Sequence, residues 1–162
     1  VLGGIPKEGS LFNLIRGVVP TTKAVHFPIS GCCRFNCYIS IDKKVDGETK
    51  QAALAALGGC DFVKHVVVVD ADINIYNEEE VMWAVATRVQ ADQDVDIIKN
   101  VKGNTLDPSQ TDNIMTAKMI IDATRPLQRP FEARVEVPKT AMAKTRLEDF
   151  IPRSVVDRLP KV

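Results

Sequence analysis

The sequence predicts an α/β fold with three layers, in which helices cover both faces of a mixed β-sheet. Four consecutive valines at positions 66–69 are typical of a central strand that is buried on both faces. Asn77 precedes Glu80 by three residues, a capping-box spacing that predicts a helix beginning near Glu78. Segments of strand and helix character alternate along the rest of the chain, which favours helices packed against one shared sheet.

The segment before the valine run predicts two helices and two strands. Apolar residues at helical spacing indicate a first helix over residues 6–19, and residues 21–29 and 35–41 are typical of an antiparallel pair of strands. Asp46 is expected to cap a second helix over residues 48–57, which ends at a pair of glycines.

The segment after the third helix predicts two further strands, over residues 95–101 and 118–123. Residues 103–113 are rich in Gly, Asn, Asp, Pro and Ser and are expected to form an irregular loop. We therefore expect the sheet to continue beyond the valine strand, with this loop as its least regular connection.

The length of the chain suits one domain of ordinary size. Residues 1–131 are expected to form that α/β domain, and residues 132–162 a proline-punctuated extension with one or two short helices over residues 145–159. The chain opens at Val1 within what looks like a glycine-bearing turn, which predicts a piece of a longer protein.

Charge and composition argue against several classes of protein. The 21 basic and 21 acidic side chains cancel, so no overall field attracts nucleic acid or an anionic membrane. The sequence has neither a signal peptide nor an apolar span, which predicts a soluble, cytoplasmic protein. Its four cysteines lack zinc-site spacing and are expected to be reduced, while His26 and His65 are expected to be hydrogen-bonded strand residues.

Three ordered motifs resemble the C-terminal domain of the UbiD family of decarboxylases, which use a prenylated flavin. The first motif is an acidic turn followed by a helix, with family-like residues at Asp70, Asp72, Ile73, Val81, Trp83, Ala84, Thr87 and Arg88. The second is the loop Leu106, Asp107, Pro108 and Ser109, and the third is the segment Ile121, Asp122, Ala123 and Thr124. The segments around the third motif look nearer to members that act on hydroxybenzoate-type or phenolic acids.

The resemblance implies the C-terminal lid and oligomerisation domain of a reversible decarboxylase of aromatic or α,β-unsaturated acids. In the family, a preceding flavin-binding domain of the same polypeptide holds prenylated FMN with a divalent metal, Mn or Mg, and K. That domain also supplies the catalytic Glu-Arg-Glu set, which matches nothing here. The resemblance therefore implies no catalytic, cofactor or metal residue in this chain, no activity for it alone, and a homo-oligomeric enzyme.

The resemblance also assigns roles to two groups of residues. The residues that match pocket-facing parts of the family are Leu11, Phe12, Asn104, Thr105 and Leu106. The residues expected to be structural are Asp70, Asp72, Trp83, Thr87, Arg88, Asp107, Pro108, Asp122 and Thr124. Independently of the family, Arg88 at the end of its helix is expected to reach a carboxylate such as Asp70 or Asp122, and Trp83 is expected to be an apolar or interface anchor.

Two other functions remain open at this point. The chain could be a self-standing interaction or regulatory module that keeps the fold without the chemistry. Asp70 and Asp72, at the end of a strand, also suit a magnesium-dependent phosphoryl-transfer enzyme, although Asn74 stands where Thr or Val is expected. A calcium-binding EF-hand is excluded, because the sixth loop position is Ile75 and the twelfth is Val81.

Overall fold

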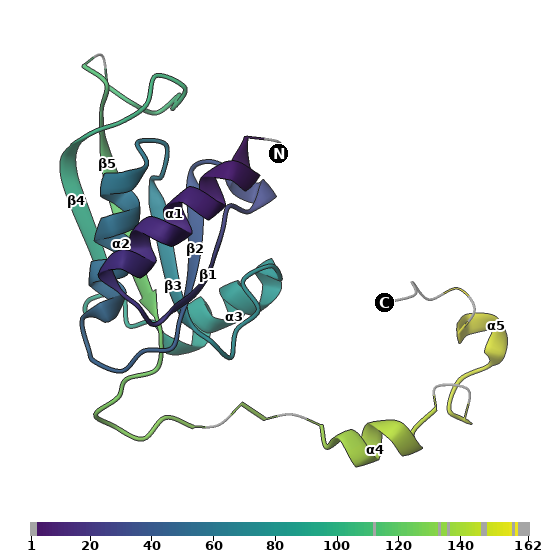
Figure 1. Ribbon diagram of the computed structural model, residues 1–162. Helices are drawn as coiled ribbons and strands as arrows, with labels where there is room; N and C mark the ends of the chain where they lie inside the picture. Colours follow the sequence, from purple (N-terminus) through teal and green to yellow (C-terminus); the bar gives the residue numbers. More distant parts are fainter. Residues whose placement is uncertain are drawn as a thin grey trace. The chain divides into compact units, whose positions relative to one another are not determined.

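The computed structural model describes residues 3–111, 113–132, 134–135, 137–146, 149–156 and 158. The chain divides into two compact units, Val1–Pro130 and Phe131–Val162. The larger unit holds the sheet and its helices, shown in Figure 1. Its elements, in chain order, are α1 (Gly4–Val18), β1 (Thr22–His26), the 3₁₀ turn η1 (Ile29–Gly31), β2 (Asn36–Ile41), α2 (Glu48–Gly59), β3 (His65–Asp70), α3 (Glu78–Arg88), β4 (Val95–Lys102) and β5 (Met115–Ala123).

The sheet has five strands in the order β1-β2-β3-β5-β4. The three inner strands β2, β3 and β5 run parallel, and β1 and β4 are antiparallel at the two edges. The sheet is therefore mixed, as predicted, and the valine strand β3 lies in its centre. The predicted antiparallel pairing of the first two strands is also confirmed.

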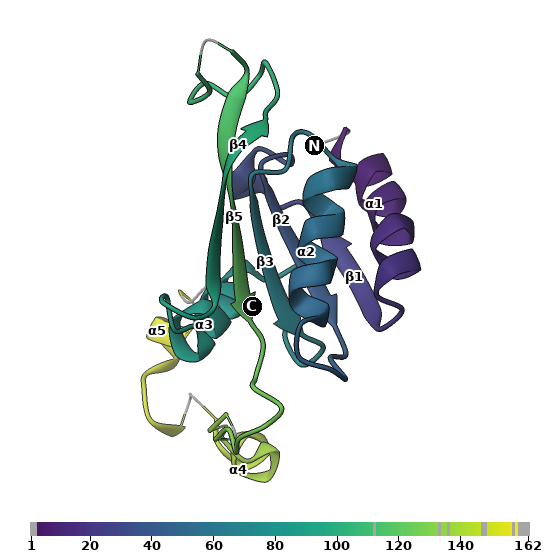
Figure 2. The same ribbon diagram turned by 90° about the vertical axis from the view of Figure 1, so that its left-hand side faces the viewer.

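Helices cover both faces of this sheet, which confirms the predicted three layers. Helices α1 and α2 pack on one face and α3 on the other, as Figures 1 and 2 show. The valines of β3 alternate between the two cores: Val66 and Val68 face α1 and α2, whereas Val67 and Val69 face α3. Four β-branched residues in a row are needed because both faces of this strand are dry.

Both edge strands are irregular. The pairing of β1 with β2 shifts register between Thr22 and Ala24, and the pairing of β4 with β5 shifts between Ile98 and Val101. In the second shift, Asn100 adopts a left-handed conformation with φ 59°. Beyond it, β4 and β5 continue as a ribbon that extends past the other strands at the upper end of Figure 2.

The helix starts differ in detail from their sequence predictions. Helix α2 begins at Glu48 as expected, but its N-cap is Gly47 in a left-handed conformation, not Asp46. The carboxylate of Glu48 instead accepts hydrogen bonds from the amides of Lys44 and Val45, so the preceding turn is closed from inside the helix. Asn77 does cap α3 through the Glu79 amide.

The smaller unit contains the short helices α4 (Lys139–Lys144) and α5 (Arg153–Val156). Helix α4 was not expected from the sequence, whereas α5 lies within the predicted helical segment 145–159; residues 147–148, 157 and 159 of that segment lie outside the described residues. None of the residues of this unit whose exposure the structure describes is buried. Within the described ranges, no helix of either unit is long and apolar enough to cross a bilayer.

Candidate functional site

The acidic motif after β3 is closed by two arginines. Arg88 Nη1 donates to Asp70 Oδ2 at 2.8 Å, and Arg88 Nη2 donates to Asp72 Oδ2 at 2.9 Å. The backbone amide of Arg125 donates to Asp70 Oδ2 at 2.8 Å. The predicted contact between Arg88 and Asp70 is therefore present, and it joins the end of β3 to the end of α3 and to the chain that leaves β5.

Hydrogen bonds from Arg88 keep Asp72 charged. The Arg88 side chain is 2% exposed, and its guanidinium carbon lies 5.4 Å from the ring centroid of the half-buried Trp83. Burial works to raise the pKa of Asp72, but hydrogen bonds from Arg88 outweigh it and hold that pKa below its ordinary value. Both carboxylates are thus engaged by guanidinium groups, which compete with the magnesium ion that a phosphoryl-transfer enzyme would place there.

The third motif is separate from this network. Asp122 accepts hydrogen bonds from the Thr49 hydroxyl at 2.6 Å and from the Thr124 hydroxyl at 2.6 Å, and it has no contact with Arg88. Its role is to tie the first turn of α2 to the end of β5. Within the described residues, no three His, Cys, Asp or Glu side chains come together in a way that could hold a metal ion.

Asp107 of the second motif organises the loop between β4 and β5. Its carboxylate pairs with Lys64 at 2.9 Å and accepts from the amide and hydroxyl of Ser109. Burial alone would raise the pKa of Asp107, but the bonds from Lys64 and Ser109 lower it to about 2. Pro108 is exposed and follows this anchor.

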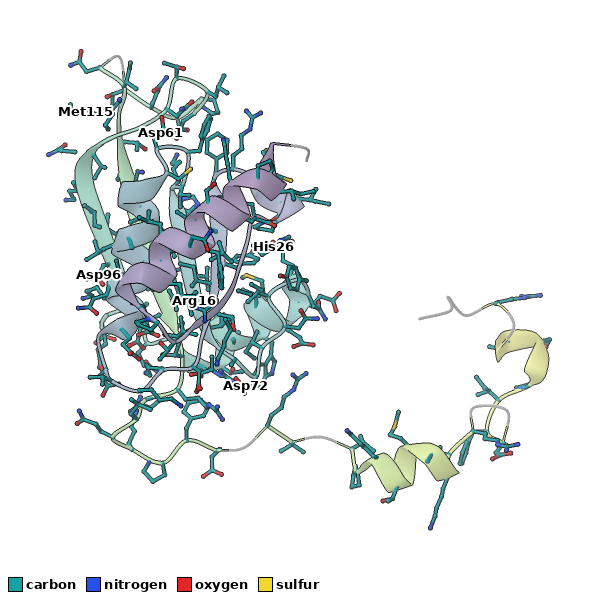
Figure 3. All side chains as sticks on the ribbon, in the orientation of Figure 1. Arg16, His26, Asp61, Asp72, Asp96 and Met115 are labelled. Carbon is teal, nitrogen blue, oxygen red and sulfur yellow. The ribbon has the colours of Figure 1, made fainter. Side chains whose placement is uncertain are left out.

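The two acidic motifs lie at opposite ends of the sheet. Lys64, the partner of Asp107, directly precedes β3, whereas Asp70 ends that strand. Six residues of strand separate them by roughly 20 Å. Figure 3 shows the same separation, with Asp61 near the upper end of the sheet and Asp72 at the lower end.

The upper end gathers side chains that suit the binding of an organic acid. We call this group the amino-end rim, because it lies where the parallel strands β2 and β3 begin. Its members are Lys7, Glu8, His26, Arg34, Asp61, Phe62 and Asn104.

Two cations of the rim lie over one aromatic ring. Lys7 Nζ is 3.6 Å from the centroid of the Phe62 ring, and the guanidinium carbon of Arg34 is 5.5 Å from it. Neither cation forms a salt bridge with a carboxylate in the described part of the chain, whose ion pairs involve other residues. Two cations that form no salt bridge, beside a half-buried aromatic ring, suit an anionic ligand that carries an apolar or planar body, and Glu8 and Asp61 bring two carboxylates to the same rim.

The turn that presents Arg34 is strained. Cys32 and Cys33 both adopt left-handed conformations, with φ 55° and 54°. Each such residue costs on the order of 1 kcal/mol, so the surroundings must impose the conformation. Gly31 is required here as well, because a Cβ atom at this position would lie 2.6 Å from the Cβ of Asn36.

A carboxylate fixes the histidine of the rim. Glu8 Oε1, from α1, lies 2.9 Å from His26 Nδ1 and also accepts the amide of Phe27 at 2.8 Å. This contact favours the tautomer in which Nδ1 carries the proton, which leaves Nε2 to face other groups. The His26 ring also contacts Tyr76, with centroids 5.0 Å apart. His26 is thus hydrogen-bonded within the fold, as expected, but with one nitrogen still available.

A groove of about 520 Å³ runs along the rim between α1 and the turn before β3. Lys7, Leu11, Leu14, Asp61, Phe62 and Lys102 contribute to its walls. Of the predicted pocket residues, Leu11 lines this groove, and Asn104 donates to Asp61 Oδ2 at 2.9 Å. Phe12 packs half-buried against the core, and Thr105 and Leu106 are exposed on the neighbouring loop. Of the five predicted residues, only Leu11 therefore lines the groove, and Asn104 reaches it through its bond to Asp61.

No local pattern in the sequence indicates the central rim residues. Glu8 and His26 are 18 residues apart, and Lys7, Arg34 and Phe62 come from three different segments. The only local signal was the run from Gly31 to Arg34, where a glycine and two small residues precede a cation between two strands.

Comparison with known proteins places this chain in a family. Residues 1–123 match the C-terminal domain of 3-octaprenyl-4-hydroxybenzoate carboxy-lyase, the UbiD C-terminal domain. The chain is 43% identical over 127 residues to anhydromevalonate phosphate decarboxylase of Methanocaldococcus jannaschii, covering 78% of this chain and 30% of that protein. The chain therefore belongs to the UbiD family and corresponds to its C-terminal domain.

Solved structures agree in fold and in sequence. The UbiD-class enzyme HmfF from Pelotomaculum thermopropionicum, in complex with FMN, superposes with a TM-score of 0.82 and 48% identity, covering 93% of this chain and 34% of that one. Vanillic acid decarboxylase of Sedimentibacter hydroxybenzoicus in an open form superposes with a TM-score of 0.72 and 33% identity, covering 84% of this chain and 30% of that one. The closed form of the same enzyme superposes with a TM-score of 0.70 and 31% identity, covering 85% of this chain and 32% of that one. The chain thus spans about a third of the length of its relatives.

Proposed function

We propose that residues 1–131 form the domain that closes the substrate pocket of a UbiD-class decarboxylase. A flavin-binding domain of the same polypeptide would hold prenylated FMN, a divalent metal and K, and residues 132–162 would extend the domain within a homo-oligomer. The amino-end rim is the surface that faces the flavin. The rim residues carry this proposal, because they suit the binding of an organic acid.

The chemistry of the rim supports a role in binding and shielding. The flavin, when bound, supplies the electron sink for the carbanion that forms as carbon dioxide leaves. Such a species must be kept from water, and a closing domain with an apolar wall does this. Leu11 and the ring of Phe62 offer that wall here. His26 lines a separate hollow with Tyr76 and Glu78 and offers one fixed hydrogen-bonding nitrogen there. The open and closed forms of the vanillic acid decarboxylase support such a closing movement in a relative.

The proposed substrate is an aromatic or α,β-unsaturated acid with a second anionic group. The carboxylate that leaves must lie at the flavin, so the uncompensated charges of Lys7 and Arg34 are free for another acidic group. A carboxylate on an aromatic ring and a phosphate on an unsaturated acid both meet this description. Among the relatives, anhydromevalonate phosphate decarboxylase is named for a phosphate-bearing acid, whereas vanillic acid has a single carboxylate. Asn104, Thr105 and Leu106 are proposed to border the same pocket.

The test is to remove the two cations in the flavin-loaded, full-length enzyme. Lys7→Met and Arg34→Gln are each expected to raise KM about 10- to 100-fold for acids with a second anionic group, with smaller changes in kcat. For acids without that group, the two variants are expected to change KM by less than about threefold. The measurement is release of carbon dioxide over a range of substrate concentrations, for a furan or benzene dicarboxylic acid, a phosphorylated unsaturated acid and benzoic acid.

Arg16→Gln is the matched control. Arg16 lies on the same helix as Lys7 and also stacks on an aromatic ring, with 5.7 Å between its guanidinium carbon and the Phe12 centroid. It is exposed and outside the groove, so its loss should leave both kinetic constants unchanged. Equal kinetics for Lys7→Met, Arg34→Gln and Arg16→Gln on every acid would contradict the proposed rim.

A further inference from the structure

One carboxylate of α3 connects three elements near the rim. Glu78 Oε1 accepts the phenol of Tyr38, on β2, at 2.7 Å and also accepts the hydroxyl of Ser30 in the turn η1. Ser30 is 48 residues away in sequence and Tyr38 is 40 residues away. Two residues before Glu78, Tyr76 contacts the ring of His26. The start of α3 is thereby fastened to the segment between β1 and β2.

That segment is the strained turn that carries Arg34. Every backbone amide over residues 31–35 donates to a carbonyl within the turn, to Pro28, Ile29 or Gly31. Cys32 and Cys33 keep their left-handed conformations inside this hydrogen-bonded unit. The turn is closed by hydrogen bonds of its own backbone, and Ser30 within it is tied to Glu78 of α3. Loss of this side-chain contact is therefore expected to loosen the whole turn.

We propose that Glu78 is a positioning residue that holds this turn, and with it Arg34, in place for the substrate. The role of Arg34 in this statement rests on the proposed function, whereas the hold of Glu78 on the turn does not. Glu78 acts through Ser30 and Tyr38 and need not touch the substrate itself. A residue at the start of α3 thereby sets the affinity of the rim for anionic groups.

The protonation states agree with this role. Hydrogen bonds from Ser30 and Tyr38 lower the pKa of Glu78, so it is a carboxylate at neutral pH. Burial, together with the bond to Glu78, raises the pKa of Tyr38 to about 12, so its phenol remains a donor. A simple helix-dipole role does not explain the contacts, because Glu79 and Glu80 place acidic charge in the same first turn.

The experiment compares Glu78→Gln with Glu79→Gln. The two variants remove one charge from the same turn of α3, but Glu79 is exposed and only its backbone amide takes part in the cap. In the full-length, flavin-loaded enzyme, Glu78→Gln is expected to raise KM about tenfold for a dicarboxylic acid, with kcat changed less than threefold or so. Amide hydrogen exchange over residues 31–35 is expected to quicken about tenfold or more, and Glu79→Gln is expected to change neither quantity.

A double-mutant cycle with Arg34→Gln separates positioning from general stability. If Glu78 acts through Arg34, adding Glu78→Gln to Arg34→Gln should leave KM nearly unchanged. The proposal would be overturned if the double variant raised KM by the product of the two single-variant factors. It would also be overturned if Glu78→Gln lost its fold without faster amide hydrogen exchange confined to residues 31–35. An Arg34→Gln enzyme with normal KM would instead defeat the proposed function. Exchange at residues 31–35 would then decide separately whether Glu78 holds the turn.

Discussion

At the scale of single residues, the side chains of the chain divide into those that hold loops and those that are left for a ligand. Asp107 belongs to the first group, since its carboxylate is 4% exposed and accepts from Lys64 and Ser109. Lys7 and Arg34 belong to the second, because their partner is an aromatic ring and not an acid. The distinction rests on counter-charge: a compensated charge stabilises the fold, and an uncompensated one near a groove is available for recognition.

Asp107 should give the domain a measurable acid dependence. Its pKa is lowered in the folded protein from 3.8 to about 2, so the stabilisation is complete above about pH 4 and is lost as the pH falls through 2. Asp107→Asn should therefore lower the free energy of unfolding by about 1–2 kcal/mol at pH 7, and the difference from the unmodified chain should shrink between pH 4 and pH 2. Urea unfolding at several pH values measures this.

The exposed Asp92 provides the control for this acid dependence. Asp92→Asn should change the free energy of unfolding by less than about 0.5 kcal/mol at any pH. A constant difference between Asp107→Asn and the unmodified chain from pH 7 down to pH 2 would show that ion pairing does not cause the effect.

At the same scale, sequence reasoning succeeded where the partners are close in the chain and failed where they are not. The contact of Arg88 with Asp70 could be predicted because a strand, a turn and a helix of known lengths separate them. The pairs Glu8 with His26 and Arg34 with Phe62 depend on how α1 and the turn before β3 meet, which no local pattern encodes.

At the scale of elements, the acidic motif after β3 is a clamp between strand ends and helix α3. Asp70 is nearly buried, whereas the side chain of Asp72 is 42% exposed. Arg88 connects them and is itself almost wholly buried. The clamp also fixes the loop 71–77, from which Tyr76 contacts His26, and the start of α3, where Glu78 binds Ser30 and Tyr38. A motif at one end of the sheet thus supports geometry at the other.

Breaking the clamp from its two sides should have unequal costs. Arg88→Met leaves the nearly buried Asp70 with only Arg125 and should cost about 3 kcal/mol of unfolding free energy. Asp72→Asn removes a half-exposed partner and should cost less than about 1 kcal/mol. Chemical denaturation of both variants, beside the exposed Arg16→Met, measures the contrast, and equal costs for Arg88→Met and Asp72→Asn would disprove the clamp.

Elements were predicted best where periodicity and caps agree. Helix α3 begins at Glu78 as expected because Asn77 is a strong cap, and β3 is central because its valine run is long. The prediction that Asp46 caps α2 was wrong, because Gly47, with φ 99°, closes the turn without a side-chain acceptor. A turn at Ser30 and Gly31 was expected between the first two strands, and η1 lies there. The left-handed backbone of Cys32 and Cys33, just after it, escaped prediction because cysteines carry no turn signal.

At the scale of the whole molecule, the two units differ in how they can be stable. Residues up to Pro130 enclose two hydrophobic cores, whereas none of the later residues whose exposure the structure describes is buried. Helices of six and four residues are not stable on their own in water. We therefore expect the second unit to contribute to association with other chains and not to the folding of the first.

Removal of residues 131–162 tests this expectation. The shortened chain should unfold in urea with a free energy within about 0.5 kcal/mol of the complete chain. The complete chain is expected to associate, as judged by light scattering, and the shortened chain to associate less; neither should bind flavin in a fluorescence titration or release carbon dioxide from an acid. A large loss of stability on shortening would contradict the expectation that residues 131–162 do not contribute to the folding of the first unit. Turnover by either chain alone would contradict the expectation that the chain is inactive without a flavin-binding domain.

The irregular pairing of β1 and β4 has a consequence for how copies of the chain can meet. A neighbouring sheet can add to an outer strand only if it finds an even row of free amides and carbonyls, and the shifted registers interrupt that row on both flanks. On the β4 side, the lysines at 99 and 102 add repulsion between like copies. Fibre-like stacking through strand edges is thereby disfavoured, so contacts between copies must use helices, loops or the ends of the sheet.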